Sequence, residues 1–363
     1  MGRLESKPQM FAYSGRLTER QREILLGVLL SFVETAEPIG SKTLARKYVR
    51  NLSSATIRNE LAELTEKGYL EQPHTSAGRV PTDKTYRFYV DQLNRLPPLP
   101  RKEVERIWVG YYQARSLSLE AVLEQTSKVL SSLTHQASVV LLPNLSKMVL
   151  SQVRFIKLRP KAALVIVVAK NGMVQDRSVE LEEDLPQELL DKIARCLNEE
   201  YQGLTLRDIR RRVSLQMIEH KREIDILYRE TRKMSQKAFL ETAKEGDGFF
   251  LGGTNHIFEQ PEFQADVDKM RALFETFEKK EKLISILDRC MEAEGISVHI
   301  GSENEIEAMT QCALVTRSYG DGTQNLGTLG VVGPKRMPYP RIMALVDQTA
   351  SVLSQVLAAQ AAR

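Results

Sequence analysis

The chain has 363 residues, and 42% of them are hydrophobic. This length and composition predict two or three globular domains with ample core and argue against general disorder. The formal net charge is +4, and residues 1–95 carry 15 Lys and Arg against 11 Asp and Glu, so the whole excess lies in the first quarter of the chain. Such an asymmetry predicts an anionic partner for the N-terminal part.

Cysteine usage and apolar runs indicate the compartment. The three cysteines (Cys196, Cys290 and Cys312) lie far apart without metal or redox spacing, and an odd number suits a reducing cytoplasm. We interpret them as core thiols. The N-terminus lacks the apolar region of a signal peptide, and the longest apolar run, residues 162–169, is too short to span a membrane. A soluble cytoplasmic protein without a membrane partner is expected.

Three short helices are predicted near the N-terminus. The first begins after Thr18, because Thr18 and Gln21 have the spacing of a capping box. Its apolar positions are Ile24, Leu25, Val28, Leu29 and Phe32. Residues 38–52 predict a second short helix and a tight turn, and a third helix follows. The first helix should cover the other two and leave the third presented outward, as in helix-turn-helix proteins.

The third helix has one narrow apolar stripe. Ser53 is a suitable N-cap, and Gly68 is a suitable residue just beyond the helix end. Ile57, Leu61 and Leu64 recur at the i, i+4, i+7 spacing of a buried helix face. The rest of the helix surface is therefore free to contact another molecule.

The opposite face of this helix suits DNA. At about 100° per residue, Ala55, Arg58, Asn59 and Ala62 share that face. Arg can donate two hydrogen bonds to guanine, Asn can pair with the adenine edge, and small residues allow close approach. Residues 38–59 also contain five basic side chains and no acidic one, namely Lys42, Arg46, Lys47, Arg50 and Arg58. Since amphipathic helices with an exposed Arg and Asn are common, this helix alone does not establish DNA binding.

A hairpin predicted after Gly68 strengthens the interpretation. Residues 69–73 predict a strand, residues 74–79 a loop of small polar residues, and Val80 and Pro81 the return. A hairpin after a recognition helix is the wing of a winged helix and would face the DNA backbone or a minor groove; the alternative is an ordinary surface turn. The predicted DNA contacts are Lys42, Lys47, Arg50, Ser54, Ala55, Thr56, Arg58, Asn59, His74, Thr75, Ser76 and Arg79.

Five segments together resemble one protein family. LTERQREIL (17–25), EPIGS (37–41), SATIRNELAEL (54–64), GYL (68–70) and HTSAGRVPT (74–82) are similar to the HrcA family of heat-inducible transcription repressors. The resemblance implies a bacterial repressor that binds an inverted-repeat operator upstream of chaperone and chaperonin genes, and that depends on a GroE-type chaperonin for activity. It also implies a homodimer, nucleoid-associated when bound, with a winged helix, a GAF-like domain and a dimerising domain inserted into the latter.

The remaining chain predicts an α+β fold. A helix over residues 82–93, capped by Thr82, closes the first domain, and the stiff run LPPLP (96–100) marks a linker. The next elements expected are one long helix (102–133), strands (137–142, 148–158, 162–169 and 173–181), helices (186–290, broken at 249–255) and strands (296–300, 312–318 and 327–333). The separated strand sets are most simply one antiparallel sheet with a helical insertion. Such non-local pairing predicts slow folding and a chaperone client.

These patterns predict the domain limits. The expected domains are 1–95 for DNA binding, 96–101 for the linker, 102–181 with 293–363 for the GAF-like domain, and 182–292 for the inserted dimerising domain. Candidate dimer contacts on a helix over 215–240 are Ile218, Ile224 and Leu227, and the alternative is that they form the core of one chain.

No catalytic constellation is visible. The glycine-rich segments 320–323 and 327–333 do not fit the order of a nucleotide loop, and H-E-x-x-H, C-x-x-C and a nucleophile elbow do not occur. We therefore expect no enzyme activity, metal or cofactor. A second hypothesis remains open, because a GAF-like sheet often holds a small molecule. A metabolite-sensing regulator would show an apolar pocket with converging polar groups in residues 101–363.

Overall fold

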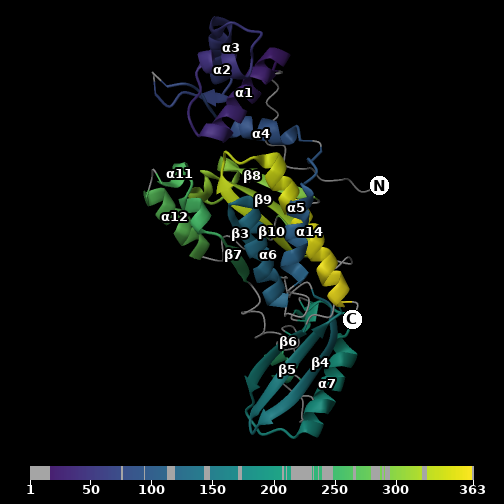
Figure 1. Cartoon of the computed structure of the whole chain (residues 1–363). Helices are drawn as coiled ribbons and strands as arrows, with labels where there is room; N and C mark the ends of the chain where they lie inside the picture. The colour runs from purple at the N-terminus through teal and green to yellow at the C-terminus, as the bar shows by residue number, and fades with distance from the viewer. Residues whose placement is uncertain are drawn as a thin grey trace, which may run out of the picture.

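The structure, a computed structural model, has three units, which Figure 1 shows from top to bottom: an N-terminal head, a central body and a lower unit. It describes residues 17–361 except 75–76, 94, 113–118, 143–147, 171–173, 207, 210, 214–230, 232, 236, 239–247, 265–266, 279–286, 288–289, 291–294 and 321–324. The predicted site residues Thr75, Ser76, Ile218, Ile224 and Leu227 lie outside the described residues.

The head contains the predicted helices and hairpin. Its elements are α1 (Glu19–Thr35), α2 (Ser41–Lys47), α3 (Ser54–Glu66), β1 (Leu70–Glu71), β2 (Val80–Pro81) and α4 (Asp83–Asp91). The capping box is confirmed, since the Gln21 amide donates to Thr18 Oγ1 at 3.2 Å. Ser53 caps α3 by accepting from the Thr56 amide at 3.1 Å. The predicted stripe of Ile57, Leu61 and Leu64 is buried against α1 and α2.

The cap predicted for α4 is confirmed in position but not in its hydrogen bond. Thr82 is the N-cap residue of α4, yet its hydroxyl makes no cap hydrogen bond to that helix. The hydroxyl instead donates to the carbonyls of Gly68 and Tyr69, at 2.8 and 2.9 Å. It therefore ties the end of α3 to the hairpin that follows, which fixes where the hairpin leaves the helix.

The long helix predicted over 102–133 is two helices in the structure. They are α5 (Arg101–Tyr112) and α6 (Leu119–Thr134), and the Tyr111 hydroxyl donates to Thr126 Oγ1 at 2.8 Å. In one straight helix these two residues would be about 22 Å apart, because the rise is about 1.5 Å per residue. The pattern of apolar residues did not reveal the reversal, because both helices bury the same kind of face.

The body is built on a five-stranded antiparallel sheet with helices on both faces. Its order is β7 (Phe249–Gly252), β3 (Ala137–Leu141), β10 (Asn325–Pro334), β9 (Cys312–Gly320) and β8 (Ile296–Ile300). The helices α5, α6 and α14 (Tyr339–Ala361) pack on one face. The other face packs against α10 (Asn255–Phe258), α11 (Pro261–Gln264) and α12 (Val267–Glu278). Short turns η4 (Gly301–Glu303) and η5 (Glu307–Met309) follow β8.

The lower unit corrects the prediction of a single sheet. β4 (Leu150–Arg159), β5 (Ala162–Ala169) and β6 (Val174–Glu180) form their own antiparallel sheet, covered on one face by α7 (Gln187–Tyr201). Of the first strand set, β3 pairs with β10 as expected, whereas β4, β5 and β6 do not join the body sheet. β7, from the stretch expected to be inserted, does join it. Alternating apolar residues identify a strand but not its partner, so the sequence could not separate the two sheets.

Among the described residues, the second face of the lower sheet carries exposed apolar side chains, and we call it the open face. Ile156, Leu158 and Val174 are 44%, 54% and 59% exposed there. The free edge of β4, by contrast, is occupied by two amides of α7. Asn198 exchanges two hydrogen bonds with the backbone of Val153, at 2.7 and 3.0 Å, and Gln187 bridges the Phe155 carbonyl and the Lys157 amide. Covering the edge prevents another strand from pairing there and leaves the open face as the accessible surface.

Among the described residues one helix is long and apolar enough to cross a membrane. It is α14, in its segment Tyr339–Ala359, and 61% of the apolar window is buried. The helix packs on β9 and on α6, and its Leu345, Val352 and Leu353 belong to the main core of the body. Such burial is typical of a core helix.

Candidate nucleic-acid interface

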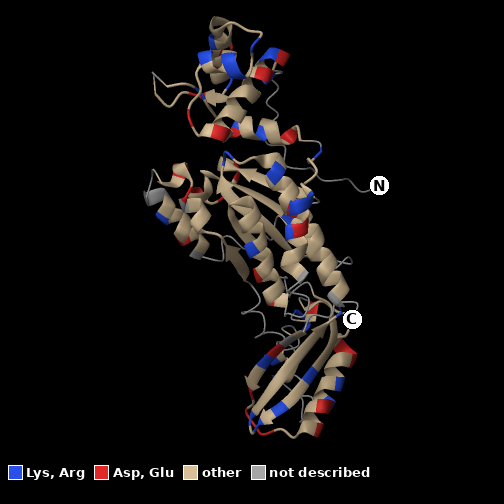
Figure 2. Cartoon of the chain, in the orientation of Figure 1, with Lys and Arg blue, Asp and Glu red and all other residues tan. Residues whose placement is uncertain are grey.

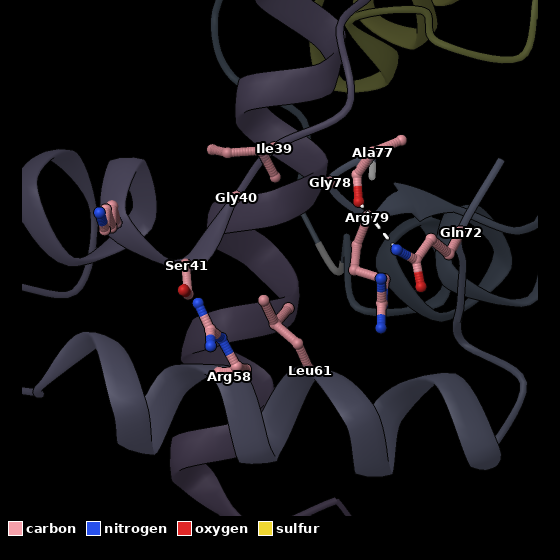
Figure 3. Close-up of a pocket in the computed structure, with 10 residues that line it drawn as sticks. Ile39, Gly40, Ser41, Arg58, Leu61, Gln72, Ala77, Gly78 and Arg79 are labelled. Carbon is pink, nitrogen blue, oxygen red and sulfur yellow. Dashed lines mark hydrogen bonds between the residues drawn. The ribbon is translucent and has the colours of Figure 1, made fainter. Parts of the chain in front are cut away.

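A basic hollow lies between α2, α3 and the hairpin of the head. It encloses about 430 Å³ and is lined by Lys42, Arg58 and Arg79 together with the polar side chains of Ser41 and Gln72. Figure 3 shows Arg58 rising from α3 toward Ser41, while Arg79 reaches from the hairpin toward the same helix. Three predicted contact residues from three separate elements are thus brought together.

Backbone pairing holds the hairpin against the start of α2. Ile39 and Arg79 exchange two backbone hydrogen bonds of 3.0 and 2.9 Å. Gly78 is required at this crossing, because a Cβ there would lie 2.4 Å from the Ile39 carbonyl carbon. The position of the hairpin relative to the first helical turn is therefore fixed by the main chain, so the cations it carries keep a defined place.

The outward face of α3 has the composition predicted for it. Ala55, Arg58, Asn59 and Ala62 are all exposed. The predicted contacts Ser54 and Thr56 are half-buried at the start of the helix, where the Thr56 hydroxyl lies 2.9 Å from that of Ser53. The four exposed residues form the surface that a groove of DNA could approach most closely.

Two acidic side chains of α3, those of Glu60 and Glu63, are bonded to α1, whereas Glu66 is exposed on the same side of the helix as Asn59 and Ala62. Gln21 of α1 is buried and donates to Glu60 and Glu63 at 3.1 and 2.8 Å, and it accepts from Lys67 at 2.9 Å. Arg20 adds an ion pair with Glu60 at 3.4 Å. The two bonded carboxylates hold α3 against α1. The capping box predicted Gln21 as a cap, but no local pattern linked it to α3.

Most predicted phosphate contacts are exposed cations. Figure 2 shows blue Lys and Arg positions on the helices of the head. Lys42, Arg50 and Arg58 make no ion pair with any other described residue. Lys47 differs, since its Nζ lies 2.7 Å from Glu34 Oε2 on α1. The hydrogen bond from Lys47 lowers the pKa of Glu34, and the same contact raises the pKa of Lys47. Lys47 therefore stays charged but is already partnered.

The hairpin residues have mixed exposure. His74 is exposed, whereas Arg79 is half-buried and its Nε donates to Thr65 Oγ1 at 3.0 Å. That bond leaves the terminal guanidinium nitrogens of Arg79 for an anion. Gln72, which the sequence did not single out, donates to the Ala77 carbonyl at 3.0 Å and so braces the described part of the loop.

The described residues contain no group of three or more His, Cys, Asp or Glu side chains placed to hold a metal. Cys290 and Cys312 are buried, as predicted for core thiols, and Cys196 is half-buried. Burial raises the pKa of Cys312 to about 12, which keeps this thiol protonated and unreactive at neutral pH.

Comparisons with known proteins show the family. The family model described as "HrcA protein C terminal domain" matches residues 120–343. The chain is 40% identical over 341 residues to the heat-inducible transcription repressor HrcA of Geobacter sulfurreducens, covering 94% of this chain and 98% of that protein. Identity to the protein of the same name from Syntrophobacter fumaroxidans is 38% over 342 residues, covering 94% and 97%. A crystal structure titled as that of a hypothetical protein shares the fold, with a TM-score of 0.61 at 23% identity over 95% of this chain and 100% of that one.

Proposed function

The chain belongs to the HrcA family of heat-inducible transcription repressors, and we propose that it represses transcription by holding a DNA operator against the exposed face of α3. The observation that carries the proposal is the convergence of Lys42, Arg58 and Arg79 beside a helix face of small residues. A polyanion would neutralise these cations, and the small residues would let α3 enter a major groove. The role is that of a binding protein and not of an enzyme.

In this proposal the head works as a winged helix. Arg58 and Asn59 read base edges, with Ser54, Ala55 and Thr56 at the start of α3 close to the bases. Lys42, Lys47, Arg50 and Arg79 hold phosphates, and His74, Thr75 and Ser76 extend the contact along the hairpin. The division follows chemistry, since base edges require directional donors whereas phosphates accept any nearby cation.

We propose that the operator is an inverted repeat bound by a homodimer. Two reading heads related by a two-fold axis match two half-sites of opposite direction. The open face of β4–β6 supports self-association, because Arg154, Ile166 and Asp176 lie in one cross-strand row on it. Arg154 and Asp176 are exposed and form no ion pair with another described residue. A two-fold axis along β5 near Ile166 would place Arg154 of each copy opposite Asp176 of the other.

The domain division is also a proposal. Residues 1–95 form the DNA-binding domain and 96–101 the linker, and the body corresponds to the GAF-like domain. The inserted dimerising domain then carries β4–β6 and α7. Its start therefore lies earlier in the chain than residue 182, in the segment after β3. Contacts of Ile218, Ile224 and Leu227 with a second copy remain a prediction.

The regulatory part rests on family membership and topology. We propose that the genes repressed are those of chaperones and chaperonins, and that a GroE-type chaperonin keeps the repressor active in the bacterial cytoplasm. β3 pairs with β10 across nearly two hundred residues of chain, and such non-local pairing slows folding. Heat-damaged proteins would occupy the chaperonin, and the slowly folding repressor would lose activity.

The ligand-sensing alternative expects an apolar pocket in residues 101–363. Among the described residues, the hollow of about 640 Å³ beside β4 and α7 does not fit it, because its lining is mainly charged and amide side chains. Gln187 and Asn198 in that lining already bond the β4 backbone. Their polar groups are therefore not free to recognise a metabolite.

A gel-shift titration tests the proposal directly. Purified chain is added to a duplex with an inverted-repeat operator from a chaperonin promoter, to a scrambled duplex, and to a duplex with one half-site. We expect a specific complex with the first duplex that salt weakens steeply. Equal affinity for all three duplexes would contradict a sequence-specific repressor.

A further inference from the structure

The head and the body meet at a polar joint centred on one face of α4. Asp83 accepts from Lys335 Nζ at 2.7 Å and from the Ser302 amide at 3.0 Å. These partners come from two separate body segments, the end of β10 and the turn η4. Gly301 fits closely here, since a Cβ on it would lie 2.1 Å from Asp83 Oδ2.

One helical turn further on, Arg87 makes a second grip. Its guanidinium donates to the Val298 carbonyl of β8 at 2.6 Å and to both carboxylate oxygens of Glu303. Because residues four apart lie on the same helix face, Asp83 and Arg87 clasp the body from one side of α4. Asp83 is anionic and Arg87 is cationic. The body must therefore place a cation beside the first and an anion beside the second, which fixes how α4 lies on it.

Apolar packing continues across the same boundary. Tyr86 and Val90 of α4 are buried in the main core cluster of the body, and the Tyr86 ring lies 6.2 Å from that of Tyr339. A third cation, Arg336, donates to the Val33 carbonyl of α1 at 3.3 Å while bonding Glu262 of α11. Interfaces between domains normally permit motion unless they are large and apolar. This one combines a shared core with directional polar bonds.

We infer that Asp83 and Arg87 are positioning residues that aim the reading head, so that the dimer accepts only one spacing between operator half-sites. The inference rests on the proposed operator binding. Each added base pair turns one half-site by about a tenth of a helical turn relative to the other. A head clasped to the body cannot follow that rotation, whereas a head held only by the linker could.

The test uses the full chain and duplexes whose half-site spacing is changed by one, two or five base pairs. For the unmodified chain, affinity should fall by about tenfold or more at the altered spacings, because simultaneous engagement is lost. Asp83→Ala with Arg87→Ala should flatten this profile to within about threefold while affinity for a single half-site stays unchanged. Lys335→Ala removes the partner of Asp83 on the body, and it should flatten the spacing profile partly.

Lys84→Ala is the matched control, because Lys84 Nζ donates to the Lys67 carbonyl inside the head and lies over the Tyr69 ring. It should leave the spacing profile steep. An equally steep profile in the Asp83 and Arg87 double variant would overturn the inference, as would an unmodified chain that tolerates every spacing.

A distance measurement decides the inference without DNA. Spin labels are attached at Glu66→Cys on the head and Lys128→Cys on the body, both exposed, in a Cys196→Ser background. The distance distribution should be narrow in the unmodified chain and broad in the double variant. A broad distribution in the unmodified chain would refute the joint. Absence of operator binding alongside a narrow distribution would refute the proposed function and leave the joint supported.

Discussion

The exposed face of α3 and the open face of β4–β6 lie at opposite ends of the molecule and differ in chemistry (Figure 1). The α3 face consists of small residues beside Lys42, Arg58 and other cations. The lower face exposes Ile156, Leu158 and Val174 around one Arg and one Asp. A cationic surface with small residues is matched to a polyanion, whereas an apolar surface with self-complementary charges is matched to its own copy.

In the proposed function, DNA binding and self-association therefore use two separate surfaces that are connected only through the body. An apolar patch beside the DNA-binding surface would attract other proteins to it. A basic patch on the lower unit would repel the same patch of a second copy. Because the surfaces are separate, a substitution on one of them can disrupt DNA binding or self-association without altering the other surface.

Ile156→Asp should have the largest effect. A carboxylate at this position cannot be desolvated in the proposed interface, so the dimer should dissociate. Operator affinity should then fall by about 100-fold or more, because two linked heads gain that much over one. Light scattering gives the mass, and gel shift gives the affinity.

The matched control is Lys192→Asp, which places the same side chain on the exposed side of α7. It should leave both mass and affinity unchanged. A dimeric Ile156→Asp variant with normal affinity would mean that the open face is not the dimer surface, and that contacts elsewhere hold the two copies together.

Arg58→Ala should come second. Removing a bidentate donor costs about 1–3 kcal/mol and relaxes the preference at one base position, while the dimer persists. The measurement is operator affinity against duplexes that carry each of the four bases at successive positions. Unaltered discrimination at every position would show that α3 does not read bases through Arg58.

The head was largely predictable because its determinants are local. The cap at Ser53, the stripe at Ile57 and the hairpin return at Val80 all follow from residues a few positions apart. The joint was not predictable, since Asp83 meets Lys335 across 252 positions, and no local pattern marks such a pair. The strand partners of β4 and β7 were missed for the same reason. The periodicity of apolar residues also cannot predict the partners of polar side chains that bond distant parts of the chain, such as Gln21 and Asn198.

A charge exchange on the lower face should have a smaller effect. Arg154→Asp should weaken the dimer by about 1 kcal/mol, because it removes an attraction and places like charges opposite one another. Arg154→Asp with Asp176→Arg should restore the dimer, since the pattern is then mirrored in both copies. Dimer dissociation constants from analytical ultracentrifugation give both values. Failure of the double variant to recover would exclude the axis along β5.

Lys42→Ala and Lys47→Ala test the smallest effect on the DNA face. Lys42 has no ion-pair partner among the described residues, so its loss should weaken all duplexes alike and reduce the salt slope by about one. Lys47 must give up its ion pair with Glu34 to bind a phosphate, and the free energy of that pair is subtracted from its contribution, so the net change should be somewhat smaller than for Lys42. In a Glu34→Gln background Lys47 is released, and its substitution should then reduce the slope as much as that of Lys42. Equal slopes for both single variants would mean that Glu34 does not compete with DNA for Lys47.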